Sequence, residues 1–253
     1  MLSPTSALQH ASDQAVAPTL RAAAEYALHG DLRYLSHHDE LRLLARALAR
    51  AGWPVCFSRG FNPIPRLSLP LPRSVGMTSY CQWALVELHE QRTAPELFDS
   101  RAEALPPDCT LKQVLAPAAR QTPHALGVEY AVDLDPPDAL AVGSRLGRLM
   151  TAEELVVQRH GKHWPEAQAL DIRPWIETLT LDGPVLRMRL RCTQQRTARP
   201  SEILAELGLA IDAYAHRVRR ARVIWDMELA GGGILPAAPE GTQIGTAEEA
   251  THR

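Results

Sequence analysis

One order of predicted elements occurs twice along this chain, and it limits the possible folds more than any other feature. In the first half, apolar patterning predicts helices at 37–51 and 94–104 and strands at 20–28, 53–57, 66–69, 80–88 and 109–115. In the second half it predicts helices at 138–150 and 200–207 and strands at 128–134, 154–158, 175–181, 185–192 and 215–225. Each half fits βαββαβ with one extra strand or strand extension. The pattern predicts an α+β fold of duplicated ferredoxin-like units, with antiparallel sheets and helices on one face of each.

A linker separates the two predicted halves. Segment 116–125 contains Pro117 and Pro123, which discourage regular structure. We therefore expect a first half at 19–115 and a second half at 126–228. The segments 1–18 and 229–253 are rich in small or polar residues without periodic patterning, and we expect both to be disordered.

Composition limits the class of protein. The 253 residues are 45% apolar, enough for one large core or two small ones. No apolar run reaches about 18 residues, and the first residues lack the pattern of a signal peptide, so we expect a cytoplasmic protein.

The four cysteines point to structural rather than chemical roles. They lie far apart in the sequence, without a C-x-x-C pair that would suggest a zinc site or a redox motif. The three-cysteine C-x-x-x-C-x-x-C loop of radical S-adenosylmethionine enzymes is also absent from the sequence. We expect reduced, mostly buried thiols and no cofactor; these cysteines are Cys56, Cys81, Cys109 and Cys192.

Positive charge is concentrated between positions 33 and 76. This stretch contains seven arginines and only two acidic residues, Asp39 and Glu40, although the whole chain has a formal net charge of −2. Such a local excess on a near-neutral protein favours an anionic partner, with RNA as the first candidate. The arginines are Arg33, Arg42, Arg46, Arg50, Arg59, Arg66 and Arg73.

Helix 37–51 begins with a capping signal. Ser36 and Asp39 are spaced to satisfy free amides at its start, and Gly52 suits its end. The arginines of this helix follow a stripe that we expect to face solvent. His37 and His38 point in different directions on a helix, which disfavours a metal site; His37 is kept as a candidate contact for a phosphate or carboxylate.

The segment 58–66 is the strongest candidate for a binding loop. Gly60 allows unusual backbone angles, and Pro63 and Pro65 stiffen the chain around them. A guanidinium for phosphate, an aromatic ring for stacking and an amide for base edges suit single-stranded RNA. The alternative is a rigid turn whose aromatic ring fills the core, and the sequence leaves both open. The candidate residues are Arg59, Phe61, Asn62 and Arg66.

A second basic surface is predicted on strand 185–192. Arg187, Arg189 and Arg191 alternate with apolar residues, which places the three guanidinium groups on one face of a strand. Segment 216–222 adds further arginines. Their mutual repulsion calls for an anionic partner or interspersed carboxylates, and we favour the partner.

Arg173 lies in the segment Asp171-Ile172-Arg173-Pro174-Trp175. The structural interpretation is an aspartate cap before a short turn, with Arg173 paired to a carboxylate and Trp175 packed. Arg173 is nevertheless kept among the candidate binding residues.

Several motifs together resemble one known family. The segments Ser36-His37-His38-Asp39, 57–68, 71–76 and 170–174 are similar to those of the uncharacterised bacterial radical-SAM-linked protein family, over about 20–225. The resemblance implies an accessory or substrate-presenting partner of a radical S-adenosylmethionine enzyme, and it supplies no catalytic residue. The chain departs from the family pattern at His38, Ile64 and Arg66, so a loop histidine is missing.

These observations predict a binding module rather than an enzyme. The leading hypothesis is a protein that recognises RNA or a ribonucleoprotein and presents it to a separate radical enzyme. The alternatives are an RNA-modifying or RNA-processing enzyme in its own right, supported by fold analogy alone, and a protein-only adaptor whose arginines meet acidic surfaces.

Overall fold

The computed structural model describes residues 20–100, 104–116, 118, 120–160, 166–193 and 197–226. The predictions of disorder for 1–18 and 229–253 lie outside these residues. The first half contains β1 (Leu20–Leu28), η1 (Gly30–Tyr34), α1 (His37–Arg50), β2 (Leu67–Ser68), β3 (Thr78–Leu88), α2 (Ala94–Asp99) and β4 (Cys109–Leu115).

The second half is longer because a hairpin is inserted in it. Its elements are β5 (Ala125–Asp133), α3 (Pro136–Thr151), β6 (Val156–Arg159), β7 (Gln168–Asp171), η2 (Arg173–Trp175), β8 (Ile176–Asp182), β9 (Val185–Arg191), α4 (Pro200–Glu206), α5 (Ile211–Tyr214), η3 (Ala215–Arg217) and β10 (Val218–Trp225). β6 corresponds to the strand predicted at 154–158, whereas β7 was not predicted as a strand. Residues 161–165, which separate β6 from β7 in the sequence, lie outside the described residues.

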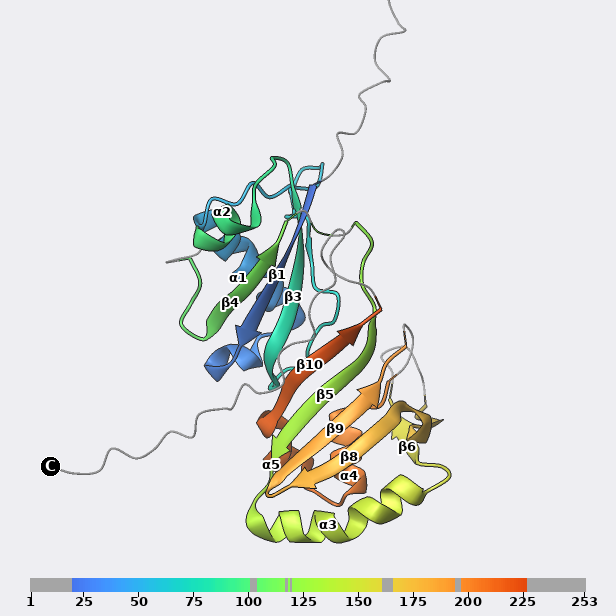
Figure 1. Cartoon of the computed structure of the whole chain (residues 1–253). Coiled ribbons are helices and arrows are strands. Elements are labelled where there is room, and N and C mark those ends of the chain that lie inside the picture. Colours follow the sequence, from blue (N-terminus) through green and yellow to red (C-terminus); the bar gives the residue numbers. More distant parts are fainter. Residues whose placement is uncertain are drawn as a thin grey trace, which may run out of the picture.

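The main sheet runs through both halves. Seven of its eight strands follow the order β4-β1-β3-β10-β5-β9-β8, and the eighth, β2, pairs with β3 off this path. All pairings are antiparallel except that of β10 with β3, which has two registered pairs, Arg219 with Thr78 and Arg220 with Ser79. The mixed α+β class predicted from the sequence is confirmed, but the sequence did not predict that one sheet joins the halves (Figure 1).

Each half has its own hydrophobic core. The first core lies between β1, β3, β4 and the apolar stripe of α1, and the second lies between β5, β8, β9 and the helices α3 and α4. In Figure 1, α1, α4 and α5 lie behind the strands. The opposite face of the first half carries a small cluster of Trp83, Leu85, Ala23 and Ala118, against which Trp225 of β10 packs.

Local signals placed α1 correctly. The Ser36 hydroxyl accepts a hydrogen bond from the Asp39 amide at 3.2 Å and donates one to the Asp39 carboxylate at 2.7 Å. The helix ends at Arg50, and Gly52 follows with φ of +70°, a conformation that favours glycine. Capping therefore explains Ser36, Asp39 and Gly52.

The thiols behave as the sequence predicted. All four cysteines are free; Cys81, Cys109 and Cys192 are buried and Cys56 is half-buried. Burial raises the pKa of Cys81 to about 11 and that of Cys109 to about 12, so neither forms a thiolate near neutral pH.

One predicted strand is reduced to isolated bridges. Segment 53–57 contributes only single pairings, Val55 with Leu88 and Phe57 with Pro65. Pro54 has no amide hydrogen to donate to a ladder, which disfavours a longer strand here. Among the described residues, no helix has both the length and the apolar content that a membrane span requires.

Candidate functional site

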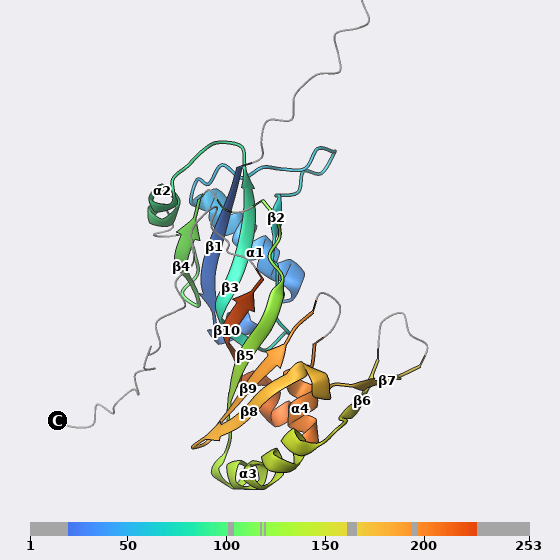
Figure 2. The ribbon, with the colours of Figure 1, turned by 45° about the vertical axis from the view of Figure 1, so that its right-hand side comes forward.

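The segment between α1 and β2 forms a short hairpin. The Ser58 amide donates to the Ile64 carbonyl at 2.8 Å, and the Ile64 amide donates to the Ser58 hydroxyl at 2.9 Å. Gly60, at φ of +146°, lies in the turn that these bonds close. Figure 2 shows this hairpin projecting away from the body of the first half, at the upper right of the view. Hydrogen bonds within the hairpin itself therefore fix the conformation of the turn.

Apolar side chains are exposed along the hairpin. Phe61 has a relative exposure of 102%, Ile64 of 66% and Phe57 of 52%. The interpretation in which Phe61 fills the core is therefore wrong. Arg59 and Asn62 are exposed as well, and neither has a hydrogen-bond or ion-pair partner among the described residues.

The base of the hairpin is fixed to β3. The Arg66 amide donates to the Cys56 carbonyl at 2.8 Å, and the Glu87 amide donates to the Arg66 carbonyl at 3.0 Å. The Arg66 guanidinium forms an ion pair with the Glu87 carboxylate at 3.0 Å. Arg66 thus has a structural partner, whereas Arg59 at the tip does not.

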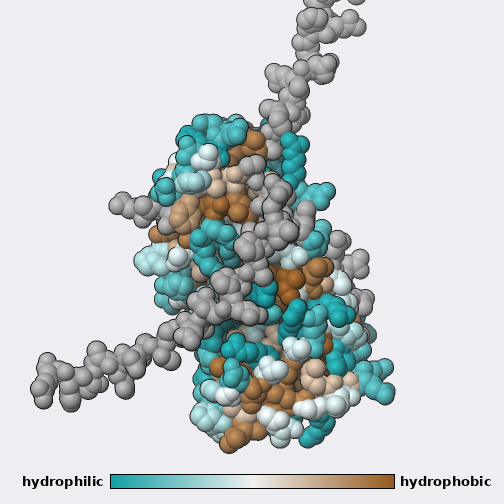
Figure 3. Space-filling view, in the orientation of Figure 1, coloured by the Kyte–Doolittle hydropathy of each residue, from teal (hydrophilic) through white to brown (hydrophobic). Residues whose placement is uncertain are grey.

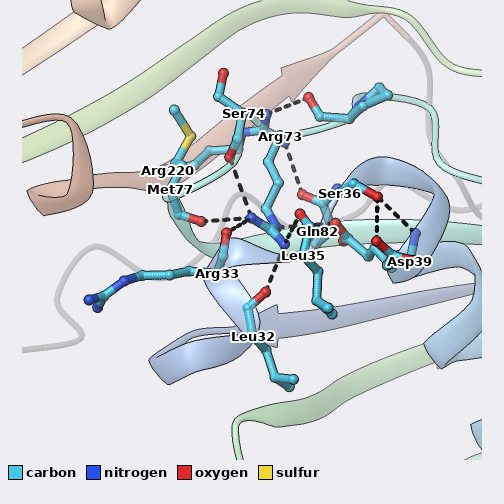
Figure 4. A network of polar contacts seen from close by, with 12 residues as sticks. Leu32, Arg33, Leu35, Ser36, Asp39, Arg73, Ser74, Met77, Gln82 and Arg220 are labelled. Carbon is cyan, nitrogen blue, oxygen red and sulfur yellow. Dashed lines mark hydrogen bonds and ion pairs between the residues drawn. The ribbon is translucent and has the colours of Figure 1, made fainter.

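Arg73, counted in the predicted basic patch, is not on the surface. Its relative exposure is 7%, and its Nε lies 3.1 Å from the Glu40 carboxylate, as an ion pair rather than an aligned hydrogen bond. Its guanidinium also donates to the carbonyls of Arg33, Leu32 at 2.9 Å and Leu35 at 3.2 Å (Figure 4). Arg73 therefore fixes the chain before α1 and contributes no charge for a ligand.

Glu40 is the acidic centre of this buried network. The Tyr26 hydroxyl donates to its carboxylate at 2.7 Å, and burial followed by the nearby Glu40 charge raises the pKa of Tyr26 well above its usual value. Glu40 precedes Leu44, Ala47 and Leu48 on the buried face of α1. That helical spacing was the sequence signal that could have identified Glu40 as a core residue.

Arg220 forms a second buried cluster between the halves. Its guanidinium donates to the carbonyls of Leu71 at 2.8 Å and Pro72 at 2.9 Å, and to the side-chain oxygen of Gln82 at 2.9 Å. Arg220 has a relative exposure of 3%, and no carboxylate contacts it in the described parts of the chain. Strand alternation with the buried Val218 was the available signal for this position.

Arg33 and His37 lie beside the first network. The Arg33 guanidinium lies over the Tyr34 ring, 4.8 Å from its centroid, and donates to the Tyr34 hydroxyl at 2.9 Å. In Figure 4 it points away from Arg73. His37 is half-buried, with its ring 5.6 Å from that of His38. Within the described residues no group of His, Cys, Asp and Glu could hold a metal ion.

The arginines of β9 lie on one exposed face, as predicted, but carboxylates neutralise them. Arg187 pairs with Asp182 at 3.4 Å. Arg189 pairs with Glu177 at 2.8 Å, and Arg191 pairs with the same Glu177 at 3.4 Å. Glu129 on the neighbouring β5 lies 3.9 Å from Arg189. Interspersed carboxylates, rather than a required ligand, thus relieve the repulsion among these arginines.

The second basic segment is paired in the same way. Arg217 forms an ion pair with Asp135 at 2.8 Å, and Arg219 forms one with Asp133. Among the described arginines of this segment, Arg222 alone is exposed without a partner. The surface over the second half mixes hydrophilic and hydrophobic residues (Figure 3).

Arg173 holds the end of a helix. Its guanidinium donates to the carbonyls of Met150 at 2.7 Å, Ala152 at 3.2 Å and Ile176 at 3.0 Å. The expected carboxylate partner is therefore wrong, because the donors go to backbone carbonyls. The expected aspartate cap is present, since the Asp171 carboxylate accepts from the Arg173 amide at 2.9 Å, and Trp175 packs against the second core.

The structure does not bring the predicted basic surfaces together. The hairpin lies beyond the far end of the first half, whereas β9 lies in the second half, at the bottom of Figure 1. Of the candidate residues, Arg59, Phe61 and Asn62 form one site at the hairpin tip, with Arg66 at its base. This tip is the candidate functional site.

Comparisons with known proteins give a family but no assigned activity. Residues 21–200 match the model of a family described as "Uncharacterized protein conserved in bacteria (DUF2344)". The match includes the hairpin and β9 and ends before β10. A search of curated proteins finds no match.

Proposed function

The chain belongs to this family of uncharacterized proteins conserved in bacteria, and we propose that it is a non-catalytic module that binds RNA or a ribonucleoprotein and presents it to a separate radical S-adenosylmethionine enzyme. The observation that carries the RNA part is the hairpin tip. It offers an uncovered aromatic ring, an unpaired guanidinium and an unpaired amide within four residues, Arg59 to Asn62. Stacking, phosphate contact and base-edge hydrogen bonding are the three contacts that single-stranded RNA offers.

Preorganisation of the tip supports binding. Two hydrogen bonds between Ser58 and Ile64 close the turn, and Pro63 and Pro65 limit backbone freedom. A ligand at this site therefore orders little of the protein, and less binding free energy is lost to conformational entropy.

The partner enzyme is proposed from the resemblance of the sequence motifs. The four cysteines are too widely spaced to form the C-x-x-x-C-x-x-C loop, so the iron–sulfur chemistry would come from another chain or domain. A module that holds RNA on a projecting hairpin leaves that RNA accessible to such an enzyme.

The strand orders support a finer proposal about the fold. The first half has the order β4-β1-β3 with β2 beside β3, and the second has β10-β5-β9-β8. β1 lies between β4 and β3, and β5 lies between β10 and β9. If the separate β6–β7 pair is left out of the count, the first strand of each half thus lies between the fourth and the third, as in a ferredoxin-like unit. We therefore propose that the chain is a tandem of two such units.

A protein-only adaptor remains a second candidate because of the paired arginines. The β9 arginines are matched by Glu129, Glu177 and Asp182, so this face presents little net charge to a polyanion. An independent enzyme is less favoured, since Glu40, the most buried carboxylate among the described residues, is held by Arg73 rather than placed in an open cleft.

Titration of the purified chain with total cellular RNA over a salt series tests the RNA part. Binding at low salt that weakens as salt rises is expected. Arg59→Ala should weaken it, while Arg148→Ala, which removes an exposed arginine of α3 without a partner in the described chain, should not. Absence of binding at low salt, or binding insensitive to salt, contradicts the RNA part.

Capture from the native host tests the partner part separately. The full chain, retrieved under mild salt, should bring down a radical S-adenosylmethionine enzyme. If the enzyme is still recovered after ribonuclease treatment, and also with the Phe61→Ala variant, the result would support the protein-only adaptor. Recovery of no such enzyme contradicts the partner part.

A further inference from the structure

The hairpin tip offers a single free ring. The relative exposure of Phe61 is 102%, so neighbouring atoms leave its ring uncovered. Phe57, the other aromatic of the hairpin, lies at its base, bridged to Pro65 and only about half exposed. One base can therefore stack on the Phe61 ring. The face of a base is covered by its neighbours in a paired and stacked helix, so the bound base must be unpaired and unstacked.

Free positive charge at the hairpin is equally limited. Arg59 has no partner in the described chain, whereas Arg66 is held by Glu87 at 3.0 Å. Arg73, close to the hairpin in sequence only, is buried and contacts Met77 just before the start of β3, whereas the hairpin base contacts Glu87 near its end. The site can therefore neutralise about one phosphate, or about two if Arg66 exchanges Glu87 for the ligand. In the described part of the chain the arginines of β9 are paired with carboxylates, so they do not extend the free positive charge of the tip.

We infer that the hairpin holds one unpaired nucleotide, such as a bulged or loop nucleotide of a folded RNA, rather than a long single-stranded tract. This inference rests on the proposed function. Phe61 stacks on the base, Arg59 contacts the adjoining phosphate and the Asn62 amide hydrogen-bonds to the base edge. The projecting shape lets the tip reach an extruded nucleotide while the body stays clear of the flanking helices (Figure 2).

Three RNAs separate the inference from the proposed function. They are a stem-loop with one bulged uridine, the same stem-loop fully paired, and one with an abasic site in place of the bulged uridine. Binding of each to the full chain is measured by fluorescence anisotropy. The bulged RNA should bind about tenfold more tightly than the other two, in line with the worth of one base stacked on an aromatic ring. The slope of log K against log salt should be shallow, about −0.7 to −1.4 for one or two phosphates.

Variants test whether the preference arises at the tip. Phe61→Ala should remove the tenfold preference, and Phe61→Tyr should retain it. Leu140→Ala is the matched control, because Leu140 on α3 is also exposed, at 81%, and lies away from the hairpin. Since Phe61 makes no core contact, loss of folding does not explain its effect.

The outcomes distinguish the two ideas. Equal affinity for all three RNAs, a steep salt slope, or a preference that survives Phe61→Ala overturns the single-nucleotide inference while RNA binding stands. Absence of binding to any RNA overturns the proposed function as well. If Phe61→Ala abolishes capture of a protein while RNA binding is unchanged, the tip is a protein contact and the inference is wrong.

Discussion

Single arginines of this chain have opposite roles that their sequence positions do not reveal. Arg59 is exposed and unpaired in the described chain, whereas Arg73, fourteen residues later, is buried against Glu40. The difference arises from contacts between distant segments. Arg73 donates hydrogen bonds to the backbone carbonyls of Leu32 and Arg33 and forms an ion pair with the Glu40 carboxylate on α1. Local charge counts therefore overestimated the surface charge between 33 and 76.

The Arg73–Glu40 pair provides a prediction at this scale. Arg73→Met keeps much of the side-chain volume but leaves the Glu40 carboxylate buried without its ion-pair partner. We expect a loss of about 3–5 kcal/mol in the free energy of unfolding, measured by urea denaturation. Arg42→Met is the control, since Arg42 pairs with Asp39 on the surface at 71% side-chain exposure, and it should change stability by no more than about 1 kcal/mol. Similar small effects for both variants would contradict a structural role for Arg73.

Elements defined by local signals were predicted from the sequence, and those defined by distant pairing were not. Capping residues and apolar spacing placed α1, and strict alternation placed the arginines of β9 on one face. The partners of those arginines, Glu129 and Glu177, come from the neighbouring strands β5 and β8, so their neutralising effect depends on strand order. Exposure of Phe61 was likewise undecided, because a rigid turn and a core plug have the same local sequence.

Arg173 provides a prediction at the scale of elements. It links the end of α3 to the start of β8 through the carbonyls of Met150, Ala152 and Ile176. Arg173→Ala leaves these acceptors without this donor, and we expect a loss of about 1–3 kcal/mol in the free energy of unfolding. Arg187→Ala, at an exposed position on β9, should lose less than about 1 kcal/mol. Equal losses in urea denaturation would show that the contacts of Arg173 do not stabilise the fold.

At the scale of the molecule, a narrow joint connects two separate cores. β10 and β3 share two registered pairs, and Arg220 reinforces them with three hydrogen bonds to residues of the first half. The sequence predicted two halves but not this joint, because the parallel pairing of β10 with β3 joins strands more than a hundred residues apart. The arrangement sets the position of the hairpin relative to the second half.

Removal of the Arg220 guanidinium should loosen this joint. In Arg220→Met, the carbonyls of Leu71 and Pro72 and the side-chain oxygen of the buried Gln82 lose a donor. We therefore expect faster amide hydrogen exchange at 78–79 and 218–220, corresponding to about 1–3 kcal/mol less protection. The strands β1 and β9 should keep their protection. Arg222→Met, at an exposed position of the same strand, is the control. Unchanged exchange at the joint, or a uniform increase throughout the sheet, contradicts this role for Arg220.

The central claim is that the hairpin tip contacts RNA in the cell. Ultraviolet crosslinking in the native host, followed by trypsin digestion and mass spectrometry, tests it directly, because cleavage after Arg59 and Arg66 releases peptide 60–66 with Phe61 inside it. We predict that this peptide carries a crosslinked nucleotide and that the crosslink disappears in Phe61→Ala. Crosslinks confined to other peptides, or no crosslink to the protein at all, would contradict the claim.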